Sequence, residues 1–294
     1  MTPLDYDYLQ KILKERSGLM LSSDKKYLLE SRLLPLARKM NLPGISELVQ
    51  KMKAGSESTI RDVVEAMTTN ETFFFRDKTP FDHFKNSVIP ELIKARANRK
   101  SLRIWCAASS TGQEPYSLAM ILKDMAGELA GWRVEIIATD LSPEVLEKSK
   151  SGLYTQFEVQ RGLPIQMLVK HFKQVGTMWQ LNPDTRSMVQ YRQFNLLQDF
   201  APLGKFDVIF CRNVLIYFDQ ATKTDIFNRL MKANEPDGYL FLGAAETVVG
   251  LTDAYRVCPQ RRGVYLPNVG AARTPTAASS LLAPTFKASA IAGR

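Results

Sequence analysis

Cysteine and histidine are scarce in this chain of 294 residues. The three cysteines, Cys106, Cys211 and Cys258, are widely spaced and form no C-x-x-C pair. The sequence therefore offers neither a disulfide framework nor a zinc knuckle, and it favours a reducing compartment. The two histidines, His83 and His171, lie far apart, and we expect no metal ion.

Several features common in hydrolases, NTPases and membrane proteins are also missing. No G-x-S-x-G elbow and no G-K-[ST] phosphate loop occurs, so hydrolase and P-loop functions have no support. No apolar run approaches the roughly 18 residues that cross a bilayer. The first residues, MTPLDYDYLQ, are acidic rather than cationic. We therefore expect no signal peptide, no insertion into a membrane and a cytoplasmic location.

Positive charge is in excess, with 39 Lys and Arg against 30 Asp and Glu and a formal net charge of +9. This excess predicts an acidic partner but does not distinguish nucleic acid, a lipid surface and an acidic protein face. Hydrophobic residues make up 45% of the chain, which is typical of a globular protein with one large domain or a smaller companion domain.

The first part of the chain predicts a helical domain over residues 1–70. Apolar residues recur at helical spacing and stop at Gly18, and Ser22 to Asp24 would cap a helix over 22–40 that Pro35 should kink or split. We assign residues 71–100 to a linker with a cofactor-contacting segment. Further helical patterns cover 45–54 and 58–68.

An α/β pattern begins at residue 101. The short apolar runs SLRIWC, WRVEIIATD and FDVIFC are each followed by a helical pattern, and GYLFLG comes last. Such alternation predicts a parallel α/β sheet, here over 101–267. Polar, mixed sequence over 151–192 predicts an inserted subdomain. Residues 268–294 contain no acid and are rich in Ala, Ser, Thr and Pro, which predicts a disordered tail.

Polar residues stand where the predicted strands end, and ligands of open α/β sheets bind beyond the carboxyl ends of their strands. Small residues and Gly112 follow the first strand, and Glu114 opens the next helix. Asp140 ends the second strand, where an acid accepts hydrogen bonds from ribose hydroxyls. Arg212 and Asn213 follow the third strand. Because G-x-G-x-x-G is absent, a ligand without phosphates fits better.

Each of these residues also has a purely structural interpretation. Glu114 would favour its helix dipole, Asp140 would cap a helix, and the Arg212–Asn213 pair would be a solvent-facing turn. Tyr217, between Ile216 and Phe218, would belong to the core. The segment TTNETFFFRD is either buried linker or an apolar wall with polar groups at its ends. The residues alone leave both interpretations open.

Six blocks then occur in order: TTNETFFFRD, WCAASSTGQEPYSLAM, ATDLSPEVLEKSKSGLY, NLLQ, FDVIFCRNVLIYFD and PDGYLFLGAAE. Over residues 5–267 the chain resembles the chemotaxis receptor methyltransferases, the CheR family. The resemblance implies an all-α N-terminal domain and a Rossmann-like α/β methyltransferase domain with a small β-subdomain insertion. It also implies a protein-glutamate O-methyltransferase that converts S-adenosylmethionine to S-adenosylhomocysteine and forms methyl esters on chemoreceptor glutamates.

The resemblance implies roles for individual residues. It places Glu114 near the methionine end of the cofactor, Asp140 on its ribose, and Asn195 and Leu196 beside its adenine. It places two groups nearest the reacting carboxylate, Arg76 and Tyr217. The other implied cofactor contacts are Asn70, Thr72, Arg76, Arg212 and Asn213.

The implied partners are the cytoplasmic helices of chemoreceptors, with recruitment to receptor arrays, no nucleic acid and a monomeric enzyme. Lys25, Arg32 and Lys39 recur every seven residues and form either a docking stripe or a solvated helix face. Family members that tether to a receptor C-terminal pentapeptide carry an extra glycine-rich loop in the β-subdomain. Here that region has only Gly176, and we expect the pentapeptide-independent form.

Two other functions compete with this one. A methyltransferase acting on amines of nucleic acid or protein would suit the positive charge, but such enzymes commonly have an N-P-P-Y-like strand end, which reads CRNVLIYF here. A non-catalytic S-adenosylmethionine-binding sensor is expected to lack Arg76 or Tyr217, and both are present.

Overall fold

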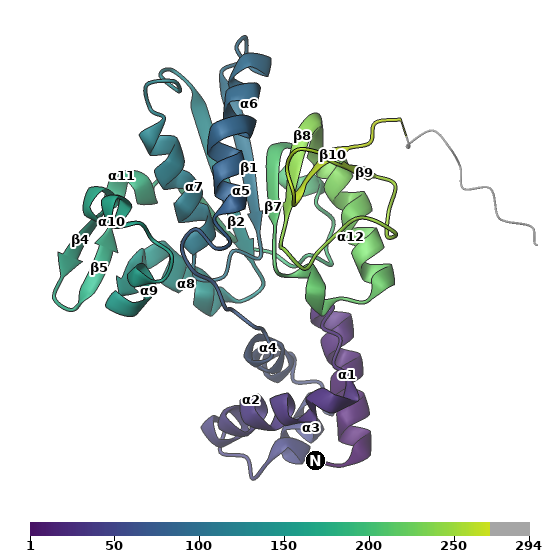
Figure 1. Cartoon of the computed structure of the whole chain (residues 1–294). Helices are drawn as coiled ribbons and strands as arrows, with labels where there is room; N and C mark the ends of the chain where they lie inside the picture. The colour runs from purple at the N-terminus through teal and green to yellow at the C-terminus, as the bar shows by residue number, and fades with distance from the viewer. Residues whose placement is uncertain (271–294) are drawn as a thin grey trace, which may run out of the picture.

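The computed structural model describes residues 1–270, in which a helical N-terminal part stands against a larger α/β part (Figure 1). From residue 271 on, the tail predicted over 268–294 lies outside the described residues. Among the described residues, no helix is both long and apolar enough to cross a membrane.

The N-terminal part is a bundle of helices with a core of its own. Thr2 caps the first helix in a capping box with Asp5, and Gly18 ends that helix with a left-handed φ of 75°. Leu9, Leu13 and residues of the following helices are buried together. The helices are α1 (Pro3–Ser17), α2 (Lys26–Lys39), α3 (Ile45–Lys53) and α4 (Glu57–Ala66).

Helix α2 differs from the predicted helix 22–40 in two ways. Ser23–Lys25 form a short 3-10 turn, closed by a hydrogen bond of 2.9 Å from the Lys25 N–H to the Ser22 carbonyl. The α-helix therefore starts at Lys26. It also runs through Pro35 without a break. Pro35 is exposed, so its ring faces solvent, and the missing N–H costs one hydrogen bond without splitting the helix.

The α/β part is built on a seven-stranded sheet in the order β6-β2-β1-β7-β8-β10-β9. Five neighbouring strands of this sheet, β6, β2, β1, β7 and β8, are parallel to one another. Strand β10 pairs antiparallel with both β8 and β9. The chain order reverses beside β1, which is where open α/β sheets bind ligands. The strands are β1 (Ser101–Ala107), β2 (Arg133–Asp140), β6 (Val189–Gln193), β7 (Phe206–Cys211), β8 (Asn234–Leu242), β9 (Tyr255–Val257) and β10 (Val264–Pro267).

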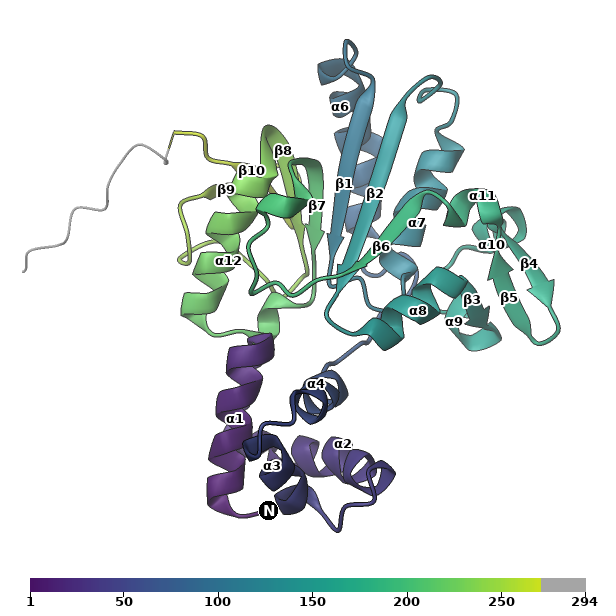
Figure 2. The ribbon, with the colours of Figure 1, turned by 180° about the vertical axis from the view of Figure 1, so that it is seen from behind.

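Both faces of this sheet are buried, one by helices and the other by α12 together with the segment 194–203 (Figure 2). Along β1, Ile104 and Cys106 belong to one apolar cluster and Trp105 to the other, as the two-residue period of a strand requires. Helix α12 covers the second cluster, and α7 lies over the first. Burial on both faces explains why these strands are apolar without interruption. The helices that follow β1, β2 and β7 are α7 (Gln113–Asp124), α8 (Pro143–Ser151) and α12 (Gln220–Ala233).

Much of the predicted linker 71–100 is helical and buried. Phe81, Phe84 and Leu92 pack into the core on the α7 side of the sheet. Their spacing is that of a helix, a signal that the linker assignment overlooked. The elements are α5 (Thr79–His83), a π-helical turn (Phe84–Val88) and α6 (Ile89–Ala95).

The insertion contains a three-stranded antiparallel sheet in the order β3-β5-β4 with three short helices around it. Strand β6 joins the seven-stranded sheet instead, so the last residues of the range 151–192 lie in the main sheet. The elements are β3 (Leu153–Thr155), α9 (Gln156–Gln160), α10 (Ile165–His171), β4 (Phe172–Val175), β5 (Met178–Leu181) and α11 (Pro183–Arg186).

The insertion packs against the segment that joins the two parts of the chain. The Phe74 ring lies 5.0 Å from Tyr154 and 5.7 Å from Phe172, edge to face in both pairs. Gly162, with a left-handed φ of 87°, lies against the same backbone, and a Cβ there would be 2.1 Å from the Phe74 carbonyl oxygen. This close approach holds residues 73–75 in place.

Replacing Gly162 by Ala tests that contact. We expect Gly162→Ala to lower the free energy of unfolding by about 1 kcal/mol for the left-handed backbone and by a further 1–3 kcal/mol, roughly, for the clash. The matched control is Gly176→Ala, because Gly176 also has a positive φ, 59°, but has no atom within 4 Å of the added Cβ. Urea unfolding measures both variants, and equal losses would contradict the contact.

Candidate functional site

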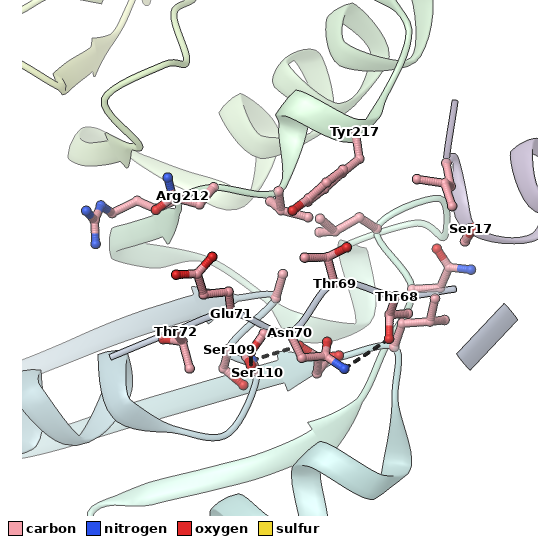
Figure 3. A pocket seen from close by; sticks show the side chains of 18 of the residues that line it. Ser17, Thr68, Thr69, Asn70, Glu71, Thr72, Ser109, Ser110, Arg212 and Tyr217 are labelled. Carbon is pink, nitrogen blue, oxygen red and sulfur yellow. Dashed lines mark hydrogen bonds between the residues drawn. The ribbon is translucent and has the colours of Figure 1, made fainter. Parts of the chain in front are cut away.

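A cavity that opens to solvent lies between the carboxyl ends of β1, β2 and β7 and the N-terminal helices (Figure 3). Every residue predicted to contact the cofactor or the reacting group lines it, whereas Lys25, Arg32 and Lys39 do not. The predicted residues in its lining are Asn70, Thr72, Arg76, Glu114, Asp140, Asn195, Leu196, Arg212, Asn213 and Tyr217.

Asp140 is held at the end of β2 by the backbone around it. Its carboxylate accepts hydrogen bonds from the N–H of Ser110 (2.8 Å) and of Ser142 (3.0 Å). Ser142, not Asp140, caps α8 by accepting the Val145 N–H, so Asp140 is free of that role. Burial raises the pKa of the Asp140 carboxyl above its usual value, while the backbone N–H groups act against this shift.

The loop after β1 brings backbone and small side chains close to the cavity. Ala108 and Ser110 have left-handed φ angles of 55° and 49°, which are costly for residues with a Cβ. Gly112 has a φ of 92°, and a Cβ there would be 2.7 Å from the Tyr191 hydroxyl. The Ser109 hydroxyl is buried in this loop and has no hydrogen-bond partner among the described residues.

Arg212 connects three walls of the cavity. Its guanidinium donates to the Glu114 carboxylate on α7 (2.7 Å), to the Asp77 carboxylate (2.7 Å) and to the Arg76 carbonyl (3.0 Å). The Arg212 side chain is only 1% exposed and that of Glu114 12%, so this pair interacts with little screening by water, whereas Asp77 is 39% exposed. Burial raises the pKa of the Glu114 carboxyl, although the positive charge of Arg212 opposes this.

The segment 70–76 forms the wall opposite the turn that carries Tyr217 (Figure 3). The Asn70 carbonyl accepts the Ser110 hydroxyl (2.7 Å), and the Asn70 amide donates to the Thr68 hydroxyl (3.0 Å). Arg76 donates to the Glu71 carbonyl (2.8 Å). Its position is therefore set by its own segment.

Tyr217 lies at the end of a 3-10 turn (Leu215–Tyr217), and its ring points into the cavity (Figure 3). The ring is half-buried. The Tyr217 carbonyl accepts the N–H of Met20 from the N-terminal part (2.8 Å). The tyrosine thus sits where the two parts of the chain meet.

Part of the cavity wall comes from the N-terminal helices, which the sequence analysis did not predict. The end of α1 is fixed to the α/β part by an ion pair between Lys14 and Asp219 (2.7 Å) and by a hydrogen bond from the Asn195 amide to the Arg16 carbonyl (2.7 Å). The Asn195 amide is therefore engaged by the chain itself. The lining residues that were not predicted include Ser17, Leu19, Met67, Thr68, Thr69 and Ser109.

Arg32, predicted to dock a partner, is bound inside the chain. Its guanidinium donates to the carbonyls of Met67 (2.7 Å) and Thr68 (2.9 Å) and to the Thr69 hydroxyl (2.9 Å). These residues belong to the cavity lining. Arg32 therefore holds the start of the cavity wall, while Lys25 and Lys39 are exposed.

The donors and acceptors of the cavity suit two ligands of opposite charge. Asp140 and Glu114 are acceptors for hydroxyl groups and attract positive charge, whereas Arg76 and the Tyr217 hydroxyl attract a carboxylate. In the part of the chain that the structure describes, no three His, Cys, Asp or Glu side chains gather as metal ligands.

Comparisons with known proteins identify the family of the chain. Residues 4–68 match the family model described as "CheR methyltransferase, all-alpha domain", and residues 70–264 match "CheR methyltransferase, SAM binding domain". The chain is 42% identical over 266 residues to chemotaxis protein methyltransferase Cher2 of Pseudomonas putida, covering 89% of this chain and 96% of that one.

Two further relatives extend the comparison. Chemotaxis protein methyltransferase 1 of Pseudomonas aeruginosa is 43% identical over 265 residues, which is 88% of this chain and 96% of the relative. The chemotaxis protein methyltransferase of Escherichia coli is 34% identical over 247 residues, which is 81% and 82% of the two chains. By both family models and by these relatives, the chain belongs to the CheR methyltransferase family.

Proposed function

We propose that the protein transfers the methyl group of S-adenosylmethionine to glutamate carboxylates of chemoreceptors and forms glutamate methyl esters. The observation that carries this proposal is the convergence of all the predicted cofactor and catalytic residues on one cavity in a chain of the CheR family. We further propose that the enzyme acts as a monomer, without nucleic acid, at receptor arrays.

The cavity has acceptors and donors that fit the methyl donor, which supplies a methyl group on a positively charged sulfur. The Asp140 carboxylate, fixed by two backbone N–H groups, is suited to ribose hydroxyls. The buried Ser109 hydroxyl, which has no hydrogen-bond partner within residues 1–270, would be a further contact for a polar group. Glu114 would hold the positively charged end, and Asn70, Thr72, Asn195, Leu196 and Asn213 would complete the enclosure.

The acceptor needs no strong base. A glutamate side chain has an unperturbed pKa of about 4.3 and is already ionised near neutral pH. The carboxylate oxygen, the methyl carbon and the sulfur must lie in line, and orientation of this kind supplies on the order of 7–11 kcal/mol. Arg76 and the Tyr217 hydroxyl would grip the carboxylate and aim one lone pair at the methyl group.

We propose that the receptor helix docks on the exposed side of α2. Five cations and two anions lie within residues 22–40, and Lys25 and Lys39 are exposed there. Arg32 contributes indirectly, because its guanidinium is bound to the cavity wall. The exposed lysines would attract an acidic helix, and Arg32 of the same helix α2 connects this surface to the cavity lining through Met67, Thr68 and Thr69.

We also propose that the enzyme works without a receptor pentapeptide tether. In the insertion, β4 ends at Val175 and β5 begins at Met178, so the hairpin is closed by Gly176 and Thr177 alone. This short turn supports the absence of an extra glycine-rich loop.

The nature of the methylated product tests the proposal. We expect purified full-length protein to transfer labelled methyl groups from S-adenosylmethionine to receptor signalling domains, and mild alkali to release that label, because esters hydrolyse where methylamines do not. Alkali-stable label on protein or nucleic acid would support an amine methyltransferase. Binding of S-adenosylmethionine without any transfer would support a sensor.

The role of Tyr217 is tested by Tyr217→Phe, which removes the hydroxyl and keeps the ring. We expect kcat to fall about ten- to hundred-fold, because a hydrogen bond to a charged group contributes about 1.5–3 kcal/mol. The Kd for S-adenosylhomocysteine should stay close to that of the wild type. Methylation assays and calorimetry measure the two quantities, and an unchanged kcat would remove Tyr217 from this role.

The role of Glu114 is tested by pH. Burial raises the pKa of its carboxyl above the usual value, so protonation sets in at a higher pH than for an exposed glutamate. Only the ionised form attracts the sulfonium, and S-adenosylhomocysteine lacks that charge. We therefore expect binding of S-adenosylmethionine to weaken relative to S-adenosylhomocysteine as the pH falls, and to do so at a higher pH than the titration of an exposed glutamate would give.

Glu114→Gln is the control for this titration. It should reduce the affinity ratio of S-adenosylmethionine to S-adenosylhomocysteine at neutral pH and flatten its pH dependence, since the charge that titrates is gone. Calorimetry at several pH values gives the ratio. A wild-type ratio that does not change with pH would show that Glu114 does not face the sulfonium.

A further inference from the structure

We propose that Glu246 is a positioning residue for methyl transfer, because its carboxylate fixes the turn over residues 213–217 that presents Asn213 and Tyr217 to the cavity. Glu246 itself does not line the cavity. The inference rests on the proposed function and assigns a task to a residue that lies just after β8, at the end of the block PDGYLFLGAAE.

The Glu246 carboxylate is surrounded by backbone amides. One oxygen accepts the N–H of Asn213 (2.8 Å) and of Gly243 (2.7 Å), and the other accepts the N–H of Val214 (2.9 Å) and of Leu215 (2.7 Å). The residue is 9% exposed. Hydrogen bonds to an ionised acceptor are about twice as strong as neutral ones. The carboxylate is thus committed to the backbone of the turn.

The turn needs such a partner for two reasons. The first N–H groups of a helical turn have no acceptor inside it, and the 3-10 turn starts at Leu215. Asn213 has a left-handed φ of 59°, a conformation that Asn adopts more readily than most residues with a Cβ and that must still be held in one orientation. Glu246 supplies the missing acceptor and fixes the Asn213 backbone at the same time.

Gly243 leaves the space that the contact between the Glu246 carboxylate and Asn213 requires. A Cβ at this position would lie 2.7 Å from the Asn213 side-chain nitrogen and 2.8 Å from the Glu246 carboxylate. Only a residue without a side chain lets the end of β8, the carboxylate and Asn213 approach so closely.

The turn is held from two sides. Glu246 binds its first amides, and the Met20 N–H binds the Tyr217 carbonyl at its other end. A misplacement of about 1 Å at a reacting group can cost on the order of a hundred-fold in rate. A change at Glu246 should therefore act on catalysis through the position of Tyr217.

The test uses Glu246→Gln in the full chain. The amide keeps the size of the side chain but turns a donor toward N–H groups of the turn. In the protein without any ligand, we expect amide hydrogen exchange at residues 213–215 to become at least about ten-fold faster. With donor and receptor, we expect kcat to fall about ten- to hundred-fold, with a smaller rise in KM for S-adenosylmethionine because Asn213 also lines the cavity.

A double-mutant cycle with Tyr217→Phe identifies the route of the effect. If Glu246 acts by placing the Tyr217 hydroxyl, the variant with both changes should lose no more activity than the more impaired single variant. Losses that multiply, or unchanged exchange at residues 213–215, would overturn the inference. A wild-type enzyme that forms no ester would instead overturn the proposed function, while the exchange experiment would still report on the turn.

Two further variants secure the interpretation. Asp207→Asn alters another buried carboxylate that accepts a backbone N–H, from Arg103 (2.8 Å), at the opposite end of β7. It should destabilise the protein but leave exchange at residues 213–215 and kcat per folded molecule unchanged. Glu246→Asp keeps the charge and shortens the reach. It should show the same effects more weakly, and it replaces Glu246→Gln if that variant does not fold.

Discussion

The buried guanidinium of Arg212 is the contact on which the cavity depends. It lies at the carboxyl end of β7 and binds the Glu114 carboxylate of α7. In the connecting segment it binds the Arg76 carbonyl and the Asp77 carboxylate. Removing one partner of a buried ion pair costs about 3–5 kcal/mol, because the other charge is left without compensation. The Arg212–Glu114 pair holds the walls of the cavity together. It also leaves the Glu114 carboxylate in the cavity lining, where we propose that the positively charged end of the donor binds.

The N-terminal helices contribute to the cavity and also carry the surface that we propose for a partner. The end of α1 contributes Ser17 and Leu19 to the lining, and Arg32 of α2 fixes the start of the opposite wall. A partner bound to α2 would therefore contact the element that also supports the cavity. In the proposed function, Arg32 would link recognition of the substrate to the geometry of the donor site, because it is bound to residues of the cavity lining.

The sequence was enough to predict the position of site residues where a general rule of sheet geometry applies. Parallel strands end at one edge of the sheet, so the sequence alone was enough to place Asp140 and Arg212 together. The rest depended on long-range contacts without a local signal. The sequence near Gly18 does not indicate that the chain just after α1 binds the Tyr217 carbonyl through Met20. The sequence near Arg32 does not indicate that its guanidinium is bound within the chain. The helices over 79–95 did have a local signal, because the apolar residues Phe81, Phe84 and Leu92 recur at helical spacing.

The proposed methyl transfer depends mainly on the alignment of the reacting atoms. It requires little stabilisation of new charge, because the positive sulfonium and the negative carboxylate neutralise each other as the methyl group moves. The proposed function depends first on the cavity being the site that binds the methyl donor. Calorimetric titration of the full chain with S-adenosylhomocysteine tests this most directly, in the wild type and in Asp140→Asn. We predict one binding site per chain and an affinity at least about ten-fold weaker in the variant, because hydrogen bonds to a charged group contribute about 1.5–3 kcal/mol. No binding by the wild type, or equal binding by both proteins, would contradict the account.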